Sequence, residues 1–167
     1  CDVDRRDVEK GTNHVKGRCP GVKGYSDYRK MLAECDNLDA VLVSTPDHTH
    51  APAAIRAMKK GCHVYVEKPL VRTIWEARYF ELVAKTNGVV TQMGNQGHSD
   101  GNYFQFKTWQ EAGVLDNVTK FVAHMNGGRR WHKWKGDPAA IKKAIAKQPN
   151  TNNVDWDTWL AHVAEHD

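Results

Sequence analysis

Tyr65-Val66-Glu67-Lys68-Pro69 is the stretch of this sequence that decides the fold. It continues a short apolar run that begins at His63, and it ends in a charged pair followed by proline. Pro69 restricts the backbone of Lys68, so the stretch predicts a strand followed by a loop that holds Lys68 extended. The bond between them is a candidate cis peptide, because only bonds before proline adopt that form at low cost. The pair alone also fits a solvated loop, but in an open parallel sheet it would lie at the edge where ligands bind.

The flanking sequence alternates strands with helices. Residues 40–44 are a continuous apolar run, which predicts a strand buried on both faces. A helix over 51–60 follows, and Thr73-Ile74-Trp75-Glu76 is a capping box for a helix that ends near Gly88. Another strand is predicted at 89–93. Such alternation with short connections predicts an α/β fold with a doubly wound parallel sheet of Rossmann type.

The first residues of the chain predict the end of an earlier strand, at 1–4, and a helix leaving it, at 5–16. A short strand at 22–25 and a helix that Ser26 caps follow. The chain opens without Met, and no G-x-G-x-x-G fingerprint occurs in it. We therefore expect a fragment that lacks the first strand of the domain and that is inactive when expressed alone.

The pattern changes after His98. A helix over 100–112 and a longer strand over 117–126 are predicted, and the basic stretch that follows contains a short helix around 139–146. We expect a truncated Rossmann domain over 1–98. Residues 99–167 then begin a second, α+β domain with an open, mostly antiparallel sheet.

Composition excludes some classes of protein and permits others. Hydrophobic residues make up 40% of the chain, charged residues 26%, and the net charge is +4. This balance is typical of a globular protein, and the mild positive charge permits anionic ligands without demanding nucleic acid. No apolar run approaches the length of a membrane span. The four cysteines show no C-x-x-C spacing, so free thiols are expected.

Right-handed crossovers would place the loops at 45–50, 67–72 and 94–100 on one edge of the sheet. The first loop offers backbone N–H groups and a helix amino terminus to an anion. Its two histidines could suggest a metal, but no third ligand is evident and we expect none. The amides of the third loop suit a ring carboxamide or a sugar hydroxyl. An Asn- and Gly-rich turn would look the same.

Two further features could take part in binding. Asp2 stands where a dinucleotide fold binds the adenosine ribose. The stretch around Arg129 and Trp131 interleaves basic and aromatic residues, which fits sugar rings beside an active site, nucleic acid, or an exposed loop.

The loops resemble those of a known family. Val41-Leu42-Val43-Ser44-Thr45-Pro46-Asp47-His48-Thr49-His50, then Val64 to Pro69, is similar to the Gfo/Idh/MocA oxidoreductases, which include glucose–fructose oxidoreductase and inositol dehydrogenase. Met93 to Ser99 and Val154 to Leu160 look like the sugar-oxidising bacterial branch. The family's first strand, its glycine loop and its catalytic Asp-x-x-x-His helix are not visible here.

The resemblance implies NAD, with NADP as the alternative, and a sugar or polyol substrate. We expect Lys68 to be the catalytic residue, and substrate contacts from Lys68, Gln96, His98, Arg129 and Trp131. The residues expected to bind the cofactor are Asp2, Ser44, Thr45, Pro46, Asp47, His48, His50, Glu67, Lys68, Pro69, Asn95 and Gln96.

The expected activity is hydride transfer between a sugar or polyol carbon and nicotinamide. One alternative is a glycosidase that oxidises its sugar transiently with bound NAD, and another is a sugar-binding relative without catalysis. At full length we expect a homo-oligomer formed through the sheet of the second domain, with no nucleic acid or membrane partner. The sequence favours the cytoplasm slightly and leaves export to the periplasm open.

Overall fold

A computed structural model describes residues 1–124, 138–139, 142 and 153–160 of the chain. The chain divides into two compact units, one made of Cys1–Asn95 with Asn152–Asp167 and the other of Gln96–Thr151. The predicted boundary at residue 98 stays a prediction.

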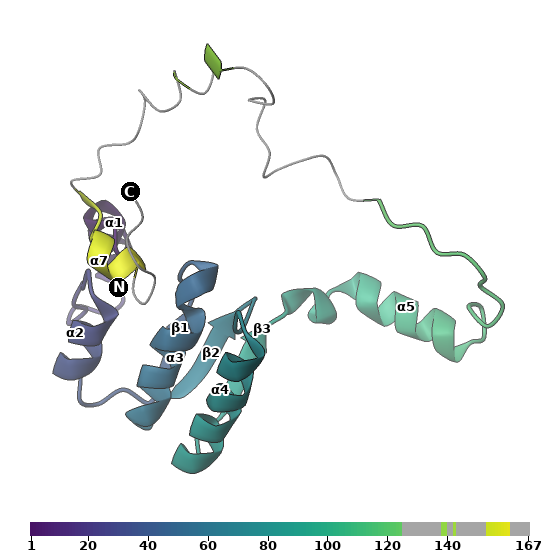
Figure 1. The fold of residues 1–167 in the computed structure, drawn as a ribbon, viewed down its shortest axis with the longest axis horizontal. Coiled ribbons are helices and arrows are strands. Elements are labelled where there is room, and N and C mark those ends of the chain that lie inside the picture. Colours follow the sequence, from purple (N-terminus) through teal and green to yellow (C-terminus); the bar gives the residue numbers. More distant parts are fainter. Residues whose placement is uncertain (125–137, 140–141, 143–152, 161–167) are drawn as a thin grey trace. The chain divides into compact units, whose positions relative to one another are not determined.

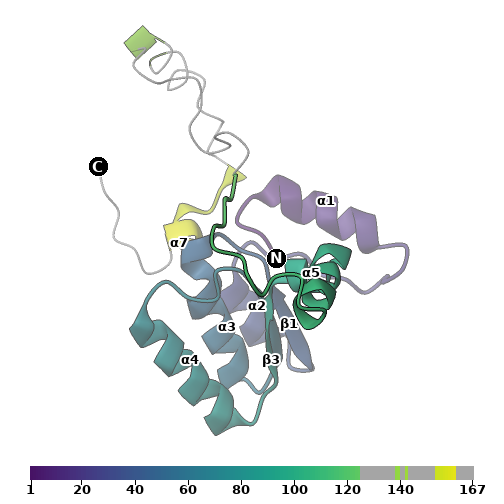
Figure 2. The same cartoon turned by 90° about the vertical axis from the view of Figure 1, so that its right-hand side faces the viewer.

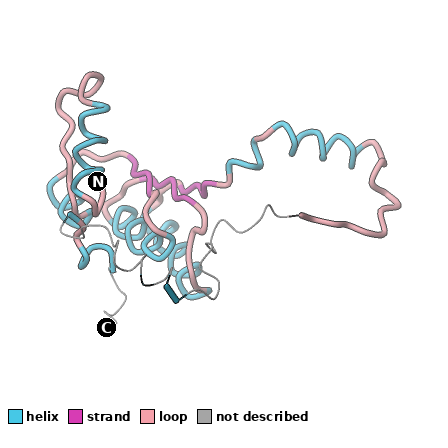
Figure 3. The backbone as a smooth tube through the Cα atoms, turned by 90° about the horizontal axis from the view of Figure 1, so that it is seen from above, coloured by secondary structure: helices cyan, strands magenta, loops and turns pink. Residues whose placement is uncertain are grey.

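The first unit is built on a parallel sheet in the order β1-β2-β3 (Figure 1), formed by Ala40–Val43, His63–Glu67 and Thr91–Gly94. Helix α3 (His50–Lys59) connects β1 to β2, and α4 (Ile74–Asn87) connects β2 to β3. Figure 2 shows both helices on the same side of the strands, and Figure 3 shows the strands as neighbouring magenta segments. The predicted alternation and the Rossmann-type sheet are confirmed.

The core lies between this sheet and its two helices. Val64 and Val66 alternate with half-buried Tyr65 along β2, so both valines share the face that the helices cover. Helix α3 presents small residues to them, and Ala54 and Met58 are completely buried. Small side chains on α3 let the helix lie close to the sheet, so the strand ends that support the site rest on a rigid layer.

Helix α4 begins and ends as its sequence predicts. Thr73 Oγ1 accepts from the Glu76 backbone N at 3.1 Å, and Glu76 Oε2 accepts from the Thr73 N at 3.1 Å. Gly88 ends the helix with φ at 63°, a conformation that favours glycine. The bond between Lys68 and Pro69 is cis.

Strand β1 differs from its prediction on one face. Val43 is 3% exposed and packs in the core, but Leu42 is 67% exposed. An apolar run indicates that both faces of a strand are hydrophobic. Burial of the second face also needs a second layer of residues packed on it, and the described residues cover β1 only on the side of the helices.

The amino-terminal region contains helices α1 (Arg5–Val15) and α2 (Tyr28–Glu34), both predicted. The cap of α2 is Asp27 and not Ser26, because the Asp27 carboxylate accepts from the Arg29 backbone N at 2.7 Å. The strand predicted at 22–25 is wrong. Its only described backbone link to residues 1–4 is the bond from Asp2 N to Tyr25 O at 3.0 Å, which is too little for a ladder.

The described part of the second unit contains a 3₁₀ helix, η2 (Gln96–Ser99), and helix α5 (Gly101–Glu111). The strand predicted at 117–126 is wrong over its described residues, 117–124. A strand needs a neighbour to take its backbone hydrogen bonds, and alternation alone does not provide one. The short helix predicted around 139–146 lies largely outside the described residues.

Candidate functional site

The carboxyl ends of the three strands meet at one edge of the sheet. The parallel register pairs Val43 with Val66, and Glu67 with Gly94. A Cβ on Gly94 would lie 2.8 Å from the Glu67 carboxylate, so glycine at this position leaves room for the acidic side chain beside β3. The loops after β1 and β2, and Asn95 directly after β3, therefore start side by side.

His50 joins the first two of these loops. Its side chain is 1% exposed, with Nε2 2.7 Å from the Thr45 carbonyl and Nδ1 2.7 Å from the Pro69 carbonyl. A carbonyl oxygen only accepts hydrogen bonds, so whichever ring nitrogen carries a proton donates to the carbonyl that it faces. The ring thus fixes the distance between the loop that begins at Thr45 and the loop that contains Lys68.

The loop after β1 combines an internal bond with an unsatisfied hydroxyl. Thr49, in the 3₁₀ helix η1 (Asp47–Thr49), donates from Oγ1 to the Pro46 carbonyl at 3.0 Å. Thr45 Oγ1 is buried without a hydrogen-bond partner among the described residues. Since buried hydroxyls are normally bonded, this atom fits a site that completes its bonding with a ligand.

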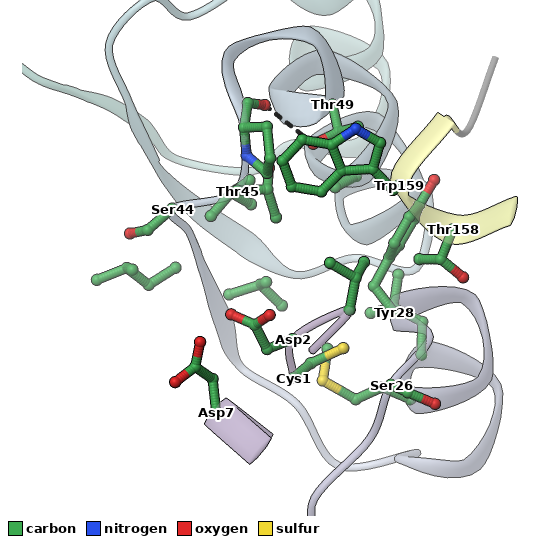
Figure 4. Close-up of a pocket in the computed structure, with 18 of the residues that line it drawn as sticks. Cys1, Asp2, Asp7, Ser26, Tyr28, Ser44, Thr45, Thr49, Thr158 and Trp159 are labelled. Atoms are coloured by element: carbon green, nitrogen blue, oxygen red, sulfur yellow. Dashed lines mark hydrogen bonds between the residues drawn. The ribbon is translucent and has the colours of Figure 1, made fainter. Parts of the chain in front are cut away.

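A cavity of about 840 Å³ lies along the open face of β1. Four residues expected to bind the cofactor, Asp2, Ser44, Thr45 and Pro46, line it. Figure 4 shows Thr45 on one side of this cavity and Asp2 with Asp7 on another. In the Rossmann strand order another strand pairs with β1 on this side, so the space along β1 includes the position of that strand and its volume is not that of a ligand site.

At its amino-terminal side the cavity is flanked by a small network of charges. Asp2 Oδ1 accepts from the Asp4 backbone N at 2.9 Å. Asp4 caps α1 and accepts from Arg6 Nε at 3.0 Å, and this side-chain hydrogen bond lowers the pKa of Asp4 to about 2. The Arg6 guanidinium is thus bound to Asp4, while the Asp2 carboxylate stays at the rim of the cavity.

The remaining predicted residues of the first unit lie on the loops themselves. Glu67 is half-buried, while Lys68 and Pro69 are exposed at the edge of the sheet. Asp47 is exposed and His48 half-buried, with the ring nitrogen Nε2 of His48 2.6 Å from the carbonyl of Trp159. The described part of the chain therefore places the residues predicted to bind the cofactor along β1 and at the carboxyl edge of the sheet, and their role stays a prediction.

The other predicted residues lie in the second unit. Gln96 and His98 belong to η2, and the His98 ring lies 5.2 Å from that of Tyr103. Arg129 and Trp131 lie outside the described residues. Their assignment to the substrate stays a prediction.

Sequence analysis missed the segment at 153–160 as part of this site. Helix α7 (Trp156–Leu160) belongs to the first unit, and just before it Asp155 N donates to the Val3 carbonyl at 2.9 Å. Asp157 lies 2.7 Å from the Arg29 guanidinium. The bonds of Arg29 with Asp27 and Asp157 raise its pKa above the usual range. An Asp three residues before Thr158 is a helix-start signal that was available, but it does not reveal what the helix contacts.

Metal binding and membrane insertion were also considered for the described residues. Within them, no group of three or more His, Cys, Asp and Glu side chains is placed to hold a metal ion. No described helix has both the length and the apolar character of a membrane span.

The fold and the loops at the carboxyl edge of the sheet together define a protein of Rossmann type. Residues 8–95, more than half of the chain, match the family described as an oxidoreductase family with an NAD-binding Rossmann fold. The chain belongs to this family, Gfo/Idh/MocA, and the resemblance seen in the loops is confirmed. The family also confirms NAD as the expected cofactor.

Each match with an individual relative takes in a larger share of this chain than of the relative. It is 30% identical to the uncharacterized oxidoreductase YdgJ of Escherichia coli over 132 residues, which are 76% of this chain and 38% of that protein. It is 38% identical to an alpha-N-acetylgalactosaminidase of Shewanella oneidensis over 81 residues, or 46% of this chain and 17% of that protein.

A solved structure also matches a larger share of this chain than of its own. The inositol dehydrogenase homolog of Azotobacter vinelandii, complexed with NADH and myo-inositol, matches with a TM-score of 0.57 and 26% identity. The match covers 68% of this chain and 31% of that one. The chain thus spans between 17% and 38% of the length of these relatives.

Proposed function

We propose that the full-length protein is an NAD-dependent oxidoreductase that moves a hydride between a sugar or polyol carbon and the nicotinamide. The observation that carries the proposal is the bridge formed by His50. It ties the loop with the unsatisfied Thr45 hydroxyl to the loop with Lys68, at 2.7 Å on each side. Cofactor and proton-transfer residues are thereby held at one edge of the sheet.

Each residue of the site has a distinct role in this proposal. Asp2 accepts from the hydroxyls of the adenosine ribose at the rim of the cavity. Thr45 completes its hydrogen bonding with the cofactor. The bound nicotinamide supplies the hydride acceptor or donor. Lys68, exposed at the edge, takes the proton of the substrate hydroxyl during oxidation and returns it during reduction.

NAD is proposed over NADP because of the charges near Asp2. A carboxylate there repels a 2′-phosphate, and an arginine would be needed to offset it. Arg6 is bound to Asp4, which reduces its ability to bind that phosphate. Titration of the full-length protein with both cofactors tests this, and tighter binding of NADP would contradict it.

The second candidate is a glycosidase that oxidises its sugar only transiently. The similarity to the Shewanella alpha-N-acetylgalactosaminidase favours it. Both reactions need the same cofactor and the same proton transfer, but they differ in the fate of the electrons. A dehydrogenase releases NADH in step with product, whereas the glycosidase regenerates NAD in each turnover.

The test supplies the full-length protein and NAD with two sets of substrates, free polyols such as myo-inositol and aryl N-acetylgalactosaminides. Accumulation of NADH with a polyol, lost in Lys68→Ala, supports the dehydrogenase. Release of the aryl group without accumulation of NADH supports the glycosidase. Binding of sugar without either reaction would overturn both and leave a sugar-binding relative.

A further inference from the structure

Two buried side chains hold the loop that carries Lys68, one near each of its ends. His50 Nδ1 lies 2.7 Å from the carbonyl of Pro69, the residue directly after Lys68. Glu76 Oε2 accepts from the Arg72 backbone N at 2.6 Å, just before α4 begins. His50 thus joins this loop to the loop after β1, whereas Glu76 joins it to the helix that follows.

Glu76 makes one bond more than a capping box requires. In a capping box, the carboxylate at the third helical position accepts from the backbone N of the N-cap residue. Glu76 Oε2 accepts in this way from Thr73 N at 3.1 Å. The same oxygen also accepts from the N of Arg72, one residue earlier, and this bond is the shorter of the two at 2.6 Å. The carboxylate therefore holds part of the loop as well as the start of the helix.

The burial of Glu76 makes these bonds costly to lose. Glu76 is 9% exposed, and a buried carboxylate is stable only when hydrogen bonds or an opposite charge replace the water that it loses. Two backbone N–H groups supply such bonds, and the Arg72 guanidinium lies 3.8 Å from Oε1. Because these partners belong to Arg72 and Thr73, the carboxylate favours one placement of this end of the loop.

The segment between the two bonded positions is short and packed. Leu70 and Val71 are partly buried against the hydrophobic core, so the segment has packing as well as hydrogen bonds to keep it in place. On the other side of Lys68, Glu67 is paired with Gly94 in the sheet. Lys68 therefore exposes its side chain from a backbone that is held both before and after it.

We propose that Glu76 is a positioning residue for Lys68, an inference that rests on the proposed function. A group that takes a proton from a substrate hydroxyl has to stand within hydrogen-bond distance of it. A displacement of about 1 Å in the reacting groups can cost about a hundredfold in rate. Glu76 acts through the backbone that carries Lys68 and makes no contact with the reacting atoms.

The test measures Glu76→Ala in the full-length protein with NAD and free polyols such as myo-inositol. Turnover should fall about ten- to a hundredfold, because the backbone of Lys68 loses a support at one end of its loop. The Kd of NAD should change less than about threefold, since the loop after β1 keeps its own bonds. Glu76→Gln keeps an acceptor oxygen and should retain more turnover than Glu76→Ala.

Thr73→Ala is the matched control. It removes the hydroxyl that accepts from Glu76 N at 3.1 Å, but it leaves the carboxylate and its two backbone donors in place. It therefore weakens the same helix start without releasing the loop, and turnover should stay unchanged. Thermal melting of each variant shows whether it remains folded at the temperature of the assay.

A double-mutant cycle separates positioning of Lys68 from a general loss of structure. In the Lys68→Ala enzyme, adding Glu76→Ala should lower the remaining turnover by less than about threefold, since the group that Glu76 positions is already absent. Equal losses in the two backgrounds would overturn the positioning role. A loss of the same size in Thr73→Ala would overturn it too, because the effect would then belong to the helix cap.

The outcomes also separate this inference from the proposed function. A wild type that forms no NADH, or a Lys68→Ala enzyme with normal turnover, overturns the proposed function and the positioning role together. A wild type that depends on Lys68, beside a Glu76→Ala enzyme with unchanged turnover, overturns the positioning role alone.

Discussion

The loops that follow β1 and β2 leave neighbouring parallel strands at the same edge, but they are built differently. The first contains a 3₁₀ turn with buried Thr49, and it ends in buried His50. The second places Lys68 and Pro69 in solvent. It is anchored at its far end, where Arg72 N donates to Glu76 Oε2 at 2.6 Å.

This difference indicates a division of labour between the loops. The first loop is held by the internal bond of Thr49 and by buried His50, so it keeps its shape without a ligand, which suits a surface that receives a cofactor. A loop that exposes an ammonium lets a substrate approach it. His50 belongs to the first loop and bonds to the second, so the relative placement of the two loops depends on one buried side chain. Under the proposed function, these loops hold the cofactor and the proton carrier.

The largest expected effect comes from Lys68. In the full-length protein, Lys68→Ala should lower turnover by about a hundred- to ten-thousand-fold, the range of general acid–base catalysis. Binding of NAD should change less than about threefold, since the first loop is intact. Lys68→Arg should not restore turnover, because a guanidinium keeps its proton. Steady-state rates with calorimetric titration of NAD test this.

The control for Lys68 is Lys85→Ala on the exposed face of α4, where Lys85 pairs only with Glu81 among the described contacts. It should leave turnover unchanged. Near-normal turnover of Lys68→Ala would contradict the role of the second loop in proton transfer, and with it the difference in function proposed for the two loops.

His50→Ala tests the link between the loops. It leaves the carbonyls of Thr45 and Pro69 without their donor in a buried place, which should lower the free energy of unfolding by about 2–4 kcal/mol. Denaturant unfolding measures this, with exposed His14→Ala as a control expected within about 0.5 kcal/mol of the wild type. Equal unfolding midpoints for His50→Ala and the wild type would show that the bridge does not hold the loops.

Thr45→Val tests whether the first loop binds the cofactor. Removal of a buried hydroxyl without a described partner should leave the stability of the free protein unchanged or raise it slightly. NAD affinity should fall about fivefold, the loss of one hydrogen bond.

Thr49→Val is the matched control, since its hydroxyl is bonded to the Pro46 carbonyl. It should lower the stability of the free protein by about 1 kcal/mol. If Thr45→Val lost the same stability and kept its NAD affinity, Thr45 would be a structural residue.

The smallest effect is expected at the anchor of the second loop. Thr73→Ala removes the cap of α4 and should cost about 1 kcal/mol of stability, with turnover unchanged because Lys68 precedes the cap. Thr86→Ala, exposed in the last turn of α4, should cost less than the cap variant. A loss of turnover in Thr73→Ala, measured well below its melting temperature, would mean that the cap also positions Lys68.

Prediction from sequence succeeded where the signal was local and failed where a neighbour was required. The capping box joins Thr73 and Glu76, which are three positions apart, and it is present as predicted. The strand predicted from 117 has no described pairing partner. The contacts of Trp159 with His48 join positions 111 residues apart, and neither residue type nor spacing encodes them.

By itself, the sequence determined the alternating strands and helices, the loop with Lys68, and the family to which the chain belongs. These follow from short-range rules, since apolar runs, caps and proline act on residues within a few positions of each other. Only the tertiary structure decided that His50 bonds to two loops at once, that the Thr45 hydroxyl has no partner among the described residues, and that Trp159 contacts His48. Burial and hydrogen-bond partners are properties of the packed chain, because each depends on which distant segment fills the space around a side chain.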